Sequence, residues 1–268
     1  MGLPSFILPI MGKGGYLPLT KAWIAATGET DTTILNALNT FEAGLIANSL
    51  TGKFNALYPF VGGTSTKHSY NFMNTSLYNL SFNGFWTHSA TGALPNGTNA
   101  YANTGYNINL LSQNDTHISY YSRTSNTTNA IDMGATGGAL QDFTYLSLRS
   151  ASVAIAVVNA LSTSFLSEAT FTNTLALGIA TRTTSNNTKL FRRTTKTESI
   201  LLNSVNNFPS QNIYIGARNA NGTALGYTNR QCAFASIGTG FSDAEANTFY
   251  TLVQAFQTNL NTTPARQV

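Results

Sequence analysis

The acidic residues are the first candidates for chemistry, because hydrolysis of a glycosidic bond needs two carboxyl groups about 5–10 Å apart. The chain has only ten Asp and Glu residues, and three of them stand at the starts of expected helices: Asp31, Asp243 and Glu245. Asp132 lies in a Gly-rich loop and Asp142 at an expected strand start, and they form the only other pair at a plausible spacing. A glycoside hydrolase is therefore one hypothesis, with these two residues as its acids.

Nucleophilic catalysis finds less support in the sequence. A serine hydrolase would need an elbow such as G-x-S-x-G, and the sequence lacks one. The histidines, His68, His88 and His117, are scattered, and we expect them at the surface or bonded to loops. Cys232 is the single cysteine, so no intrachain disulfide can form, and its apolar run indicates a buried structural thiol.

Metal and nucleic-acid sites are also poorly supported. Asp115 with Asn114, or Asp132 with nearby carbonyls, could offer oxygens to calcium, but no Asp-rich loop is present, so we predict no metal and no cofactor. The formal net charge of +4 reflects scarce acids rather than many bases, and we predict no nucleic-acid partner. The densest basic stretch reads as a hairpin with its basic side chains in solvent: Arg182, Lys189, Arg192, Arg193 and Lys196.

Carbohydrate binding is a stronger possibility, because aromatic faces beside Asn, Ser and Thr groups suit sugar rings. Tyr120 and Tyr121 are adjacent and would face opposite ways in a strand, so we expect one of them in the core. No particular loop stands out, so the sequence assigns no carbohydrate-binding residues. The candidate rings are Trp86, Tyr101, Tyr106, Tyr120, Tyr121, Tyr145 and Tyr227.

The composition indicates the elements that would position these residues. Charged residues make up 9% of the chain, against about 25% in ordinary soluble domains, whereas it has 39 Thr, 30 Asn and 23 Ser. Thr favours strands and Asn favours turns, which predicts an all-β protein. The expected strands are 56–60, 79–85, 100–102, 117–123, 143–148, 153–158, 175–180, 188–193, 199–202, 213–217 and 232–237.

Two helices interrupt this pattern. Residues 31–48 carry apolar residues at helical spacing behind Asp31, which can cap the first turn. Residues 242–260 begin with Ser242 and Glu245 at the spacing of a capping box and carry an apolar stripe. We therefore expect a helical segment at 31–54, a sandwich at 55–241, a C-terminal helix at 242–260 and a tail at 261–268.

The N-terminal residues 1–30 are predicted as an extended arm, because prolines and glycines in the first 20 positions disfavour a helix. The start has no basic region typical of a signal peptide, and no stretch is long enough to insert into a membrane. The arm either packs on a neighbouring subunit or forms an edge strand. Its candidate attachment residues are Leu3, Phe6, Ile7, Leu8 and Ile10.

Several strings resemble a concanavalin A-like, laminin-G-like jelly roll. They are 92–101 followed by 116–123, then 213–218, 234–238 and the final helix. This resemblance implies a concanavalin A-like jelly-roll sandwich with a helical N-terminal segment and a C-terminal helix. It also allows a lectin-like site.

The strings 56–63, 85–89, 120–124, 249–250 and 256–257 further resemble bacteriophage virion proteins that carry this module. The resemblance implies a virion localisation and a non-enzymatic structural role in capsid or tail, with other virion proteins and further copies of the chain as partners. Two alternatives stay open. One is a module that binds host surface carbohydrate, and the other is a glycoside hydrolase or depolymerase.

Overall fold

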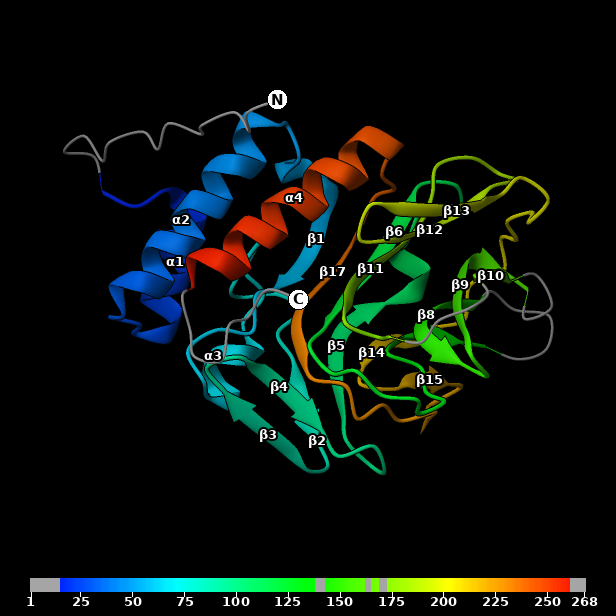
Figure 1. Ribbon diagram of the computed structural model, residues 1–268, viewed down its shortest axis with the longest axis horizontal. Helices are drawn as coiled ribbons and strands as arrows, with labels where there is room; N and C mark the ends of the chain where they lie inside the picture. The colour runs from blue at the N-terminus through cyan, green and yellow to red at the C-terminus, as the bar shows by residue number, and fades with distance from the viewer. Residues whose placement is uncertain (1–14, 138–142, 162–164, 169–172, 261–268) are drawn as a thin grey trace.

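Two β-sheets lie face to face and three long helices lie against one of them (Figure 1). The computed structural model describes residues 15–137, 143–161, 165–168 and 173–260. The predicted attachment residues Leu3, Phe6, Ile7, Leu8 and Ile10 and the predicted tail therefore lie outside the described residues, as does Asp142. Among the described residues, no helix has the length and apolar character needed to cross a membrane.

The first sheet has eight antiparallel strands. Seven of them lie in one row, and β1 pairs with β17 outside this row. Cross-strand pairs in its centre join β11, β6 and β17 along most of their lengths. Its strands, in spatial order, are β13 (Thr195–Ser199), β12 (Thr188–Arg192), β11 (Ala176–Arg182), β6 (Thr116–Ser122), β17 (Cys232–Gly238), β4 (Gly92–Pro95) and β3 (Trp86–Ser89), with β1 (Phe54–Tyr58).

The second sheet has nine strands and is antiparallel except where β15 pairs with β7. Together the sheets form the all-β jelly-roll sandwich predicted from the sequence. The strands of the second sheet are β10 (Leu166–Glu168), β9 (Val153–Ala160), β8 (Phe143–Ser150), β7 (Met133–Thr136), β14 (Asn212–Ile215), β5 (Tyr101–Asn107) and β2 (Ser81–Asn83), with β15 (Arg218–Ala220) and β16 (Thr223–Leu225).

The first sheet is buried on both faces, which explains its apolar composition. Tyr120 packs in the core between the sheets, whereas its neighbour Tyr121 packs in a second core beneath the helices. Successive strand residues face opposite sides, and both rings are fully buried. We expected one of the two rings in the core, and in fact each ring lies in a core of its own. Cys232 is buried as predicted, and its Sγ donates to the Phe234 carbonyl.

Helices α2 (Thr32–Ala47) and α4 (Asp243–Asn259) lie side by side over the first sheet (Figure 1). The Asp31 side chain caps α2 by accepting from the Thr33 N–H. Ser242 and Glu245 form the complete capping box of α4. Both predicted helices and their caps are therefore confirmed.

Helix α1 (Pro18–Thr27) corrects the prediction of an extended arm over residues 1–30. Pro18 occupies the first helical turn, where its missing N–H costs nothing. The buried Glu42 carboxylate of α2 accepts hydrogen bonds from the N–H groups of Leu19 and Thr20. This acceptor is supplied from more than 20 residues away, so the local sequence gives no sign of it.

The strand expected at 199–202 is also corrected. Strand β13 ends at Ser199, which is paired with Thr188, the first residue of β12. The ladder ends there because β12 offers no further partner, and Ile200 and Leu201 are exposed. The other short strands that the sequence did not predict are the β3–β4 hairpin, β7, β10, β15 and β16. The remaining short elements are α3 (Ser65–Ser69), η1 (Thr51–Lys53) and η2 (Ile108–Leu110).

His117 is held neutral inside the first sheet by a chain of hydrogen bonds. Its Nδ1–H donates to the Thr239 carbonyl at 2.6 Å, since a carbonyl can only accept. Its Nε2 therefore accepts from the Ser236 hydroxyl at 2.9 Å. Burial lowers the pKa of His117 from 6.5 to about 3. The imidazole thus contributes stability above pH 6.5 that is lost as the pH falls toward 3.

We expect the free energy of unfolding to fall by roughly 3 kcal/mol between pH 7 and pH 4 through His117, because the unfolded chain takes up a proton that the folded chain refuses. Urea unfolding at both pH values measures this loss. The stability of His117→Asn should depend less on pH than that of the wild type. His88 is only half-buried, so His88→Asn should keep most of the wild-type pH dependence. An equal pH dependence in wild type and His117→Asn would contradict this assignment.

Candidate functional site

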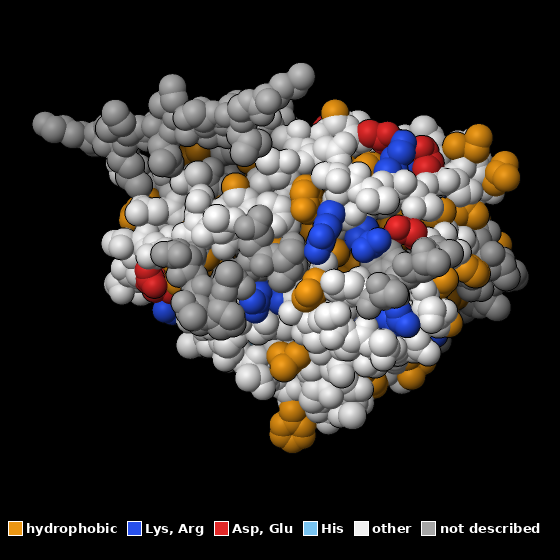
Figure 2. Space-filling view, viewed as in Figure 1, with side chains coloured by type: hydrophobic (Ala, Val, Ile, Leu, Met, Phe, Trp, Pro, Cys, Tyr) orange, Lys and Arg blue, Asp and Glu red, His pale blue; other side chains and the backbone are white. Residues whose placement is uncertain are grey.

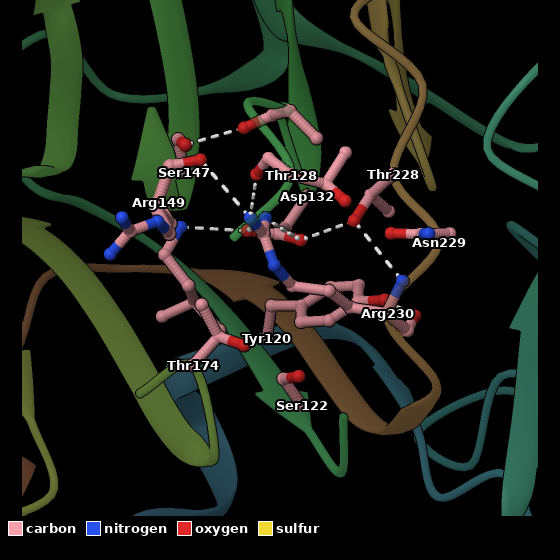
Figure 3. Close-up of polar contacts among 12 residues, drawn as sticks. Tyr120, Ser122, Thr128, Asp132, Ser147, Arg149, Thr174, Thr228, Asn229 and Arg230 are labelled. Atoms are coloured by element: carbon pink, nitrogen blue, oxygen red, sulfur yellow. Dashed lines mark hydrogen bonds and ion pairs between the residues drawn. The ribbon is translucent and has the colours of Figure 1, made fainter. Parts of the chain in front are cut away.

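The Asp132 carboxylate and the Arg230 guanidinium form a fully buried ion pair between the sheets (Figure 3). Arg230 Nη1 lies 3.0 Å from both carboxylate oxygens. Thr228 Oγ1 donates to Asp132 Oδ1 at 2.9 Å, and the Leu148 N–H donates to Oδ2 at 2.7 Å. Arg230 Nη2 in turn donates to the carbonyls of Thr128 and Arg149.

This arrangement removes Asp132 from the candidate catalytic acids. Its oxygens accept from a guanidinium, a hydroxyl and a backbone N–H, and no part of it is exposed. A general acid must reach the substrate within hydrogen-bond distance. The hydrolase hypothesis therefore loses one of its two acids, and the other, Asp142, lies outside the described residues.

The histidines expected at the surface are placed differently. His68 is buried, and its Nδ1 lies 2.9 Å from the Nδ1 of the half-buried His88. Phe82 and Trp86 pack around His88, whose pKa is lowered by burial. No group of three or more His, Cys, Asp or Glu that could hold a metal ion occurs in the described part of the chain. Of the calcium candidates, Asp115 accepts from the Gly240 N–H and Asn114 from the Ser204 hydroxyl.

The basic stretch is largely neutralised by contacts within the protein. Arg182, expected in solvent, is fully buried and donates to four backbone carbonyls and to the Thr188 hydroxyl. Lys189 and Lys196 each lie 2.6 Å from an oxygen of Asp243 at the start of α4. On the face shown in Figure 2, charged side chains are few, and Lys or Arg adjoins Asp or Glu in some places but not in the middle of the face.

The candidate sugar-binding rings fall into two groups. Tyr106, Tyr120 and Tyr121 are buried and belong to the cores. The other four are partly exposed: Trp86, Tyr101, Tyr145 and Tyr227. Three of these four contribute to the outer face of the second sheet, where two small apolar clusters are separate from the inter-sheet core.

The centre of this outer face is Gly134 of β7. Three strands place a residue beside it, because Tyr145 of β8, Tyr214 of β14 and Arg218 of β15 are all its register partners. Ile213 and Ile215 point into the inter-sheet core, so Tyr214 between them points outward. Gly134 has φ +151, and a Cβ there would lie 2.4 Å from the Cβ of Tyr145.

The tyrosines of this face contact one another. The Tyr101 ring stacks on the Tyr214 ring with centroids 4.4 Å apart and an interplanar angle of 24°, and Tyr227 packs in the same cluster. Burial raises the pKa values of Tyr145 and Tyr214. The phenols therefore stay protonated at neutral pH and can donate hydrogen bonds. We call Tyr101, Tyr145, Tyr214, Tyr227 and Arg218 the tyrosine face.

Trp86, on β3 of the first sheet, belongs to neither of these clusters and packs against the edge of the inter-sheet core. Its indole lies against Gly216, where an added Cβ would be 3.0 Å from two ring carbons. Its Nε1–H donates to the Asn83 carbonyl at 3.0 Å. The neighbouring Phe85, in the turn before β3, is 76% exposed, so aromatic surface continues beyond Trp86.

A separate hollow of about 410 Å³ lies at the end of β5. The Asn55 amide donates to the Tyr106 hydroxyl at 2.8 Å, and that hydroxyl lies 3.3 Å from the Leu110 carbonyl. The Tyr106 hydroxyl is therefore already bonded within the protein. Its lining consists of Phe54, Asn55, Met73, Asn74, Leu77, Tyr78, Tyr106 and Leu110.

Sequence reasoning missed Tyr214 and Arg218 as site residues. The alternation Ile213-Tyr214-Ile215 was a usable signal, since it places the ring opposite two core residues. Nothing local indicates that Tyr101 stacks on Tyr214, because the pair is 113 positions apart in the sequence and meets only through the pairing of β14 with β5.

Comparisons with known proteins give structural matches only, since no protein-family model and no curated protein match the sequence. The botulinum neurotoxin serotype D binding domain has 11% identity and a TM-score of 0.50, over 76% of this chain and 53% of that one. Domain 4 of a GH43 extracellular arabinanase from Geobacillus stearothermophilus, solved with arabinotriose, has 10% identity and a TM-score of 0.49, over 74% of this chain and 98% of that one.

A third similar structure is the Ruminococcus gnavus IT-sialidase CBM40, with 14% identity and a TM-score of 0.40, over 55% of this chain and 85% of that one. At such low identities the similarity is one of fold. The fold is the jelly-roll sandwich already described from the strand order.

Replacing Asp132 by Asn should lower the free energy of unfolding by about 3–5 kcal/mol, because Arg230 would stay buried without its counter-charge. Asp115→Asn is the matched control. Its carboxylate is exposed, and we expect a loss of about 1 kcal/mol or less. Urea unfolding measures both variants. An Asp132→Asn protein as stable as Asp115→Asn would show that the ion pair has no structural importance.

Proposed function

We propose that this protein is a non-catalytic carbohydrate-binding module and that the tyrosine face binds the sugar. The observation that carries the proposal is the stacked pair Tyr101–Tyr214 beside Tyr145 and Arg218 on the outer face of the second sheet. This is the lectin-like alternative from the sequence. We prefer it to a purely structural role.

The chemistry of the face supports a sugar in particular. Tyrosine rings give rigid apolar area for the C–H faces of a pyranose, and their hydroxyls hydrogen-bond to its hydroxyl groups. Tyr101 and Tyr214 are already stacked on each other. Little side-chain entropy is therefore lost when a ligand binds, which favours affinity.

The non-catalytic part of the proposal rests on the carboxylates. Hydrolysis of a glycoside needs two carboxyl groups on either side of the bond. Of the two acids that the sequence suggested, Asp132 is fully buried in its ion pair with Arg230, and Asp142 lies outside the described residues. The tyrosine face itself contains no Asp or Glu.

The virion role remains a separate prediction. It rests on the resemblance of strings such as 56–63 to bacteriophage virion proteins, and its predicted attachment residues in 3–10 lie outside the described residues. A carbohydrate-binding module on the surface of a virion would satisfy both hypotheses, since binding to a host surface glycan needs no change to the fold.

Native gels cast with single polysaccharides test the proposed function. We expect retardation in at least one gel from a panel of dextran, xylan, arabinan, polygalacturonate, alginate and polysialic acid. Tyr101→Ala should weaken binding about tenfold or more, a loss of about 1.4 kcal/mol, because it removes the ring that covers Tyr214.

The matched control is Tyr250→Ala, which removes another half-buried tyrosine, on α4. It should bind like wild type. Unretarded migration of the wild-type protein in every gel would refute carbohydrate binding. Equal weakening by both substitutions would refute the tyrosine face as the site.

A further inference from the structure

Arg218 differs from every other described arginine in having no partner. No hydrogen bond or ion pair joins any of its guanidinium nitrogens to a described residue. Its Nε is buried without a partner, as are those of Arg149 and Arg192, but these two arginines bond through their other nitrogens. The other six bond to acceptors: Arg123 to Gln231, Arg149 to Ser152, Arg182 to Val158, Arg192 to Glu168, Arg193 to Leu175 and Arg230 to Asp132.

The lack of a hydrogen-bond partner for the Arg218 guanidinium is unfavourable unless a ligand supplies an acceptor. A buried donor that loses water without gaining a partner raises the free energy of the folded state. Arg218 is half-buried, and none of the described Asp and Glu side chains lies within ion-pair distance of it. The guanidinium is a rigid fork of N–H donors that matches a carboxylate with two parallel hydrogen bonds.

The surroundings of Arg218 point to the same ligand. Arg218 and Tyr145 are both beside Gly134, and the positive charge of Arg218 acts to lower the pKa of the Tyr145 phenol, against the larger effect of burial. Tyr214 is the third residue beside Gly134. A negative group at Arg218 would thus lie near Tyr214 on the same side of β7, with Tyr145 across that strand.

We propose that the ligand is an acidic glycan whose carboxylate pairs with Arg218 while its sugar ring lies on the tyrosines. This inference rests on the proposed function and narrows it to one class of sugar. The tyrosines favour a sugar over an acidic peptide, because the residues that share Gly134 with Arg218 as register partner are both tyrosines. A neutral sugar would leave the guanidinium without an acceptor, and binding would then lose its main polar contact.

The test compares oligogalacturonate with its methyl ester, which has the same sugar backbone without the charge. We expect calorimetry of the full chain to give at least tenfold tighter binding to the acid than to the ester. Binding to the acid should weaken as salt is added, since the contact is between charges. Polysialic acid and dextran sulfate serve as further probes, and they separate carboxylate recognition from sulfate recognition.

Arg218→Gln should reduce the affinity for the acid to that for the ester, with an unchanged melting temperature. Arg218→Lys should keep part of the preference, because the charge remains while the planar fork is lost. Arg193→Gln is the matched control, since Arg193 is an exposed arginine of the β12–β13 turn, and it should bind like wild type.

The outcomes separate the two proposals. If Arg218→Gln binds the acid as tightly as wild type, or if the ester binds as tightly as the acid, the assignment of an acidic ligand is wrong while sugar binding stands. Equal affinity for polyglutamate would refute a glycan as the ligand. If wild type binds none of the saccharides, here or in the polysaccharide gels, both proposals are overturned.

Discussion

The ion pair between Asp132 and Arg230 is the contact on which the arrangement of this protein depends. Asp132 leads into β7 of the second sheet and Arg230 into β17 of the first. The Asp132 carbonyl accepts from the Gly216 N–H, and the Gly216 carbonyl accepts from the Thr228 N–H. Each of Gly134, Tyr214, Arg218 and Tyr227 lies within two residues of Asp132, Gly216 or Thr228. These hydrogen bonds therefore position the segments that carry them.

An apolar pair of similar volume could hold the sheets together at least as well, since two charges lose much hydration on burial. It could not, however, bond the backbone groups that Asp132 and Arg230 reach. The carboxylate accepts from Leu148, and the guanidinium donates to Thr128 and Arg149. The ion pair thus fixes the register of β7 against β8, and with it the position of Tyr145 beside Gly134.

The sequence predicts the elements whose signals are local. The capping box of Ser242 and Glu245 and the apolar alternation of β6 and β17 are examples. The sequence does not predict features that depend on a contact with a distant segment of the chain. Glu42 completes α1, His88 meets His68, and four strands meet to build the tyrosine face. Nothing in the sequence distinguishes Arg182 from Arg218, yet among the described residues only Arg182 has hydrogen-bond acceptors.

An NMR titration of the ¹⁵N-labelled protein distinguishes a sugar bound on the outer face of the second sheet from one bound in the hollow near Tyr106. The ligand is an oligosaccharide of the polysaccharide that retards the protein. We expect saturating amide shifts around Gly134, Tyr145, Tyr214 and Arg218, with none near Asn55, Tyr78 or Tyr106. Shifts confined to the residues of the hollow would contradict it.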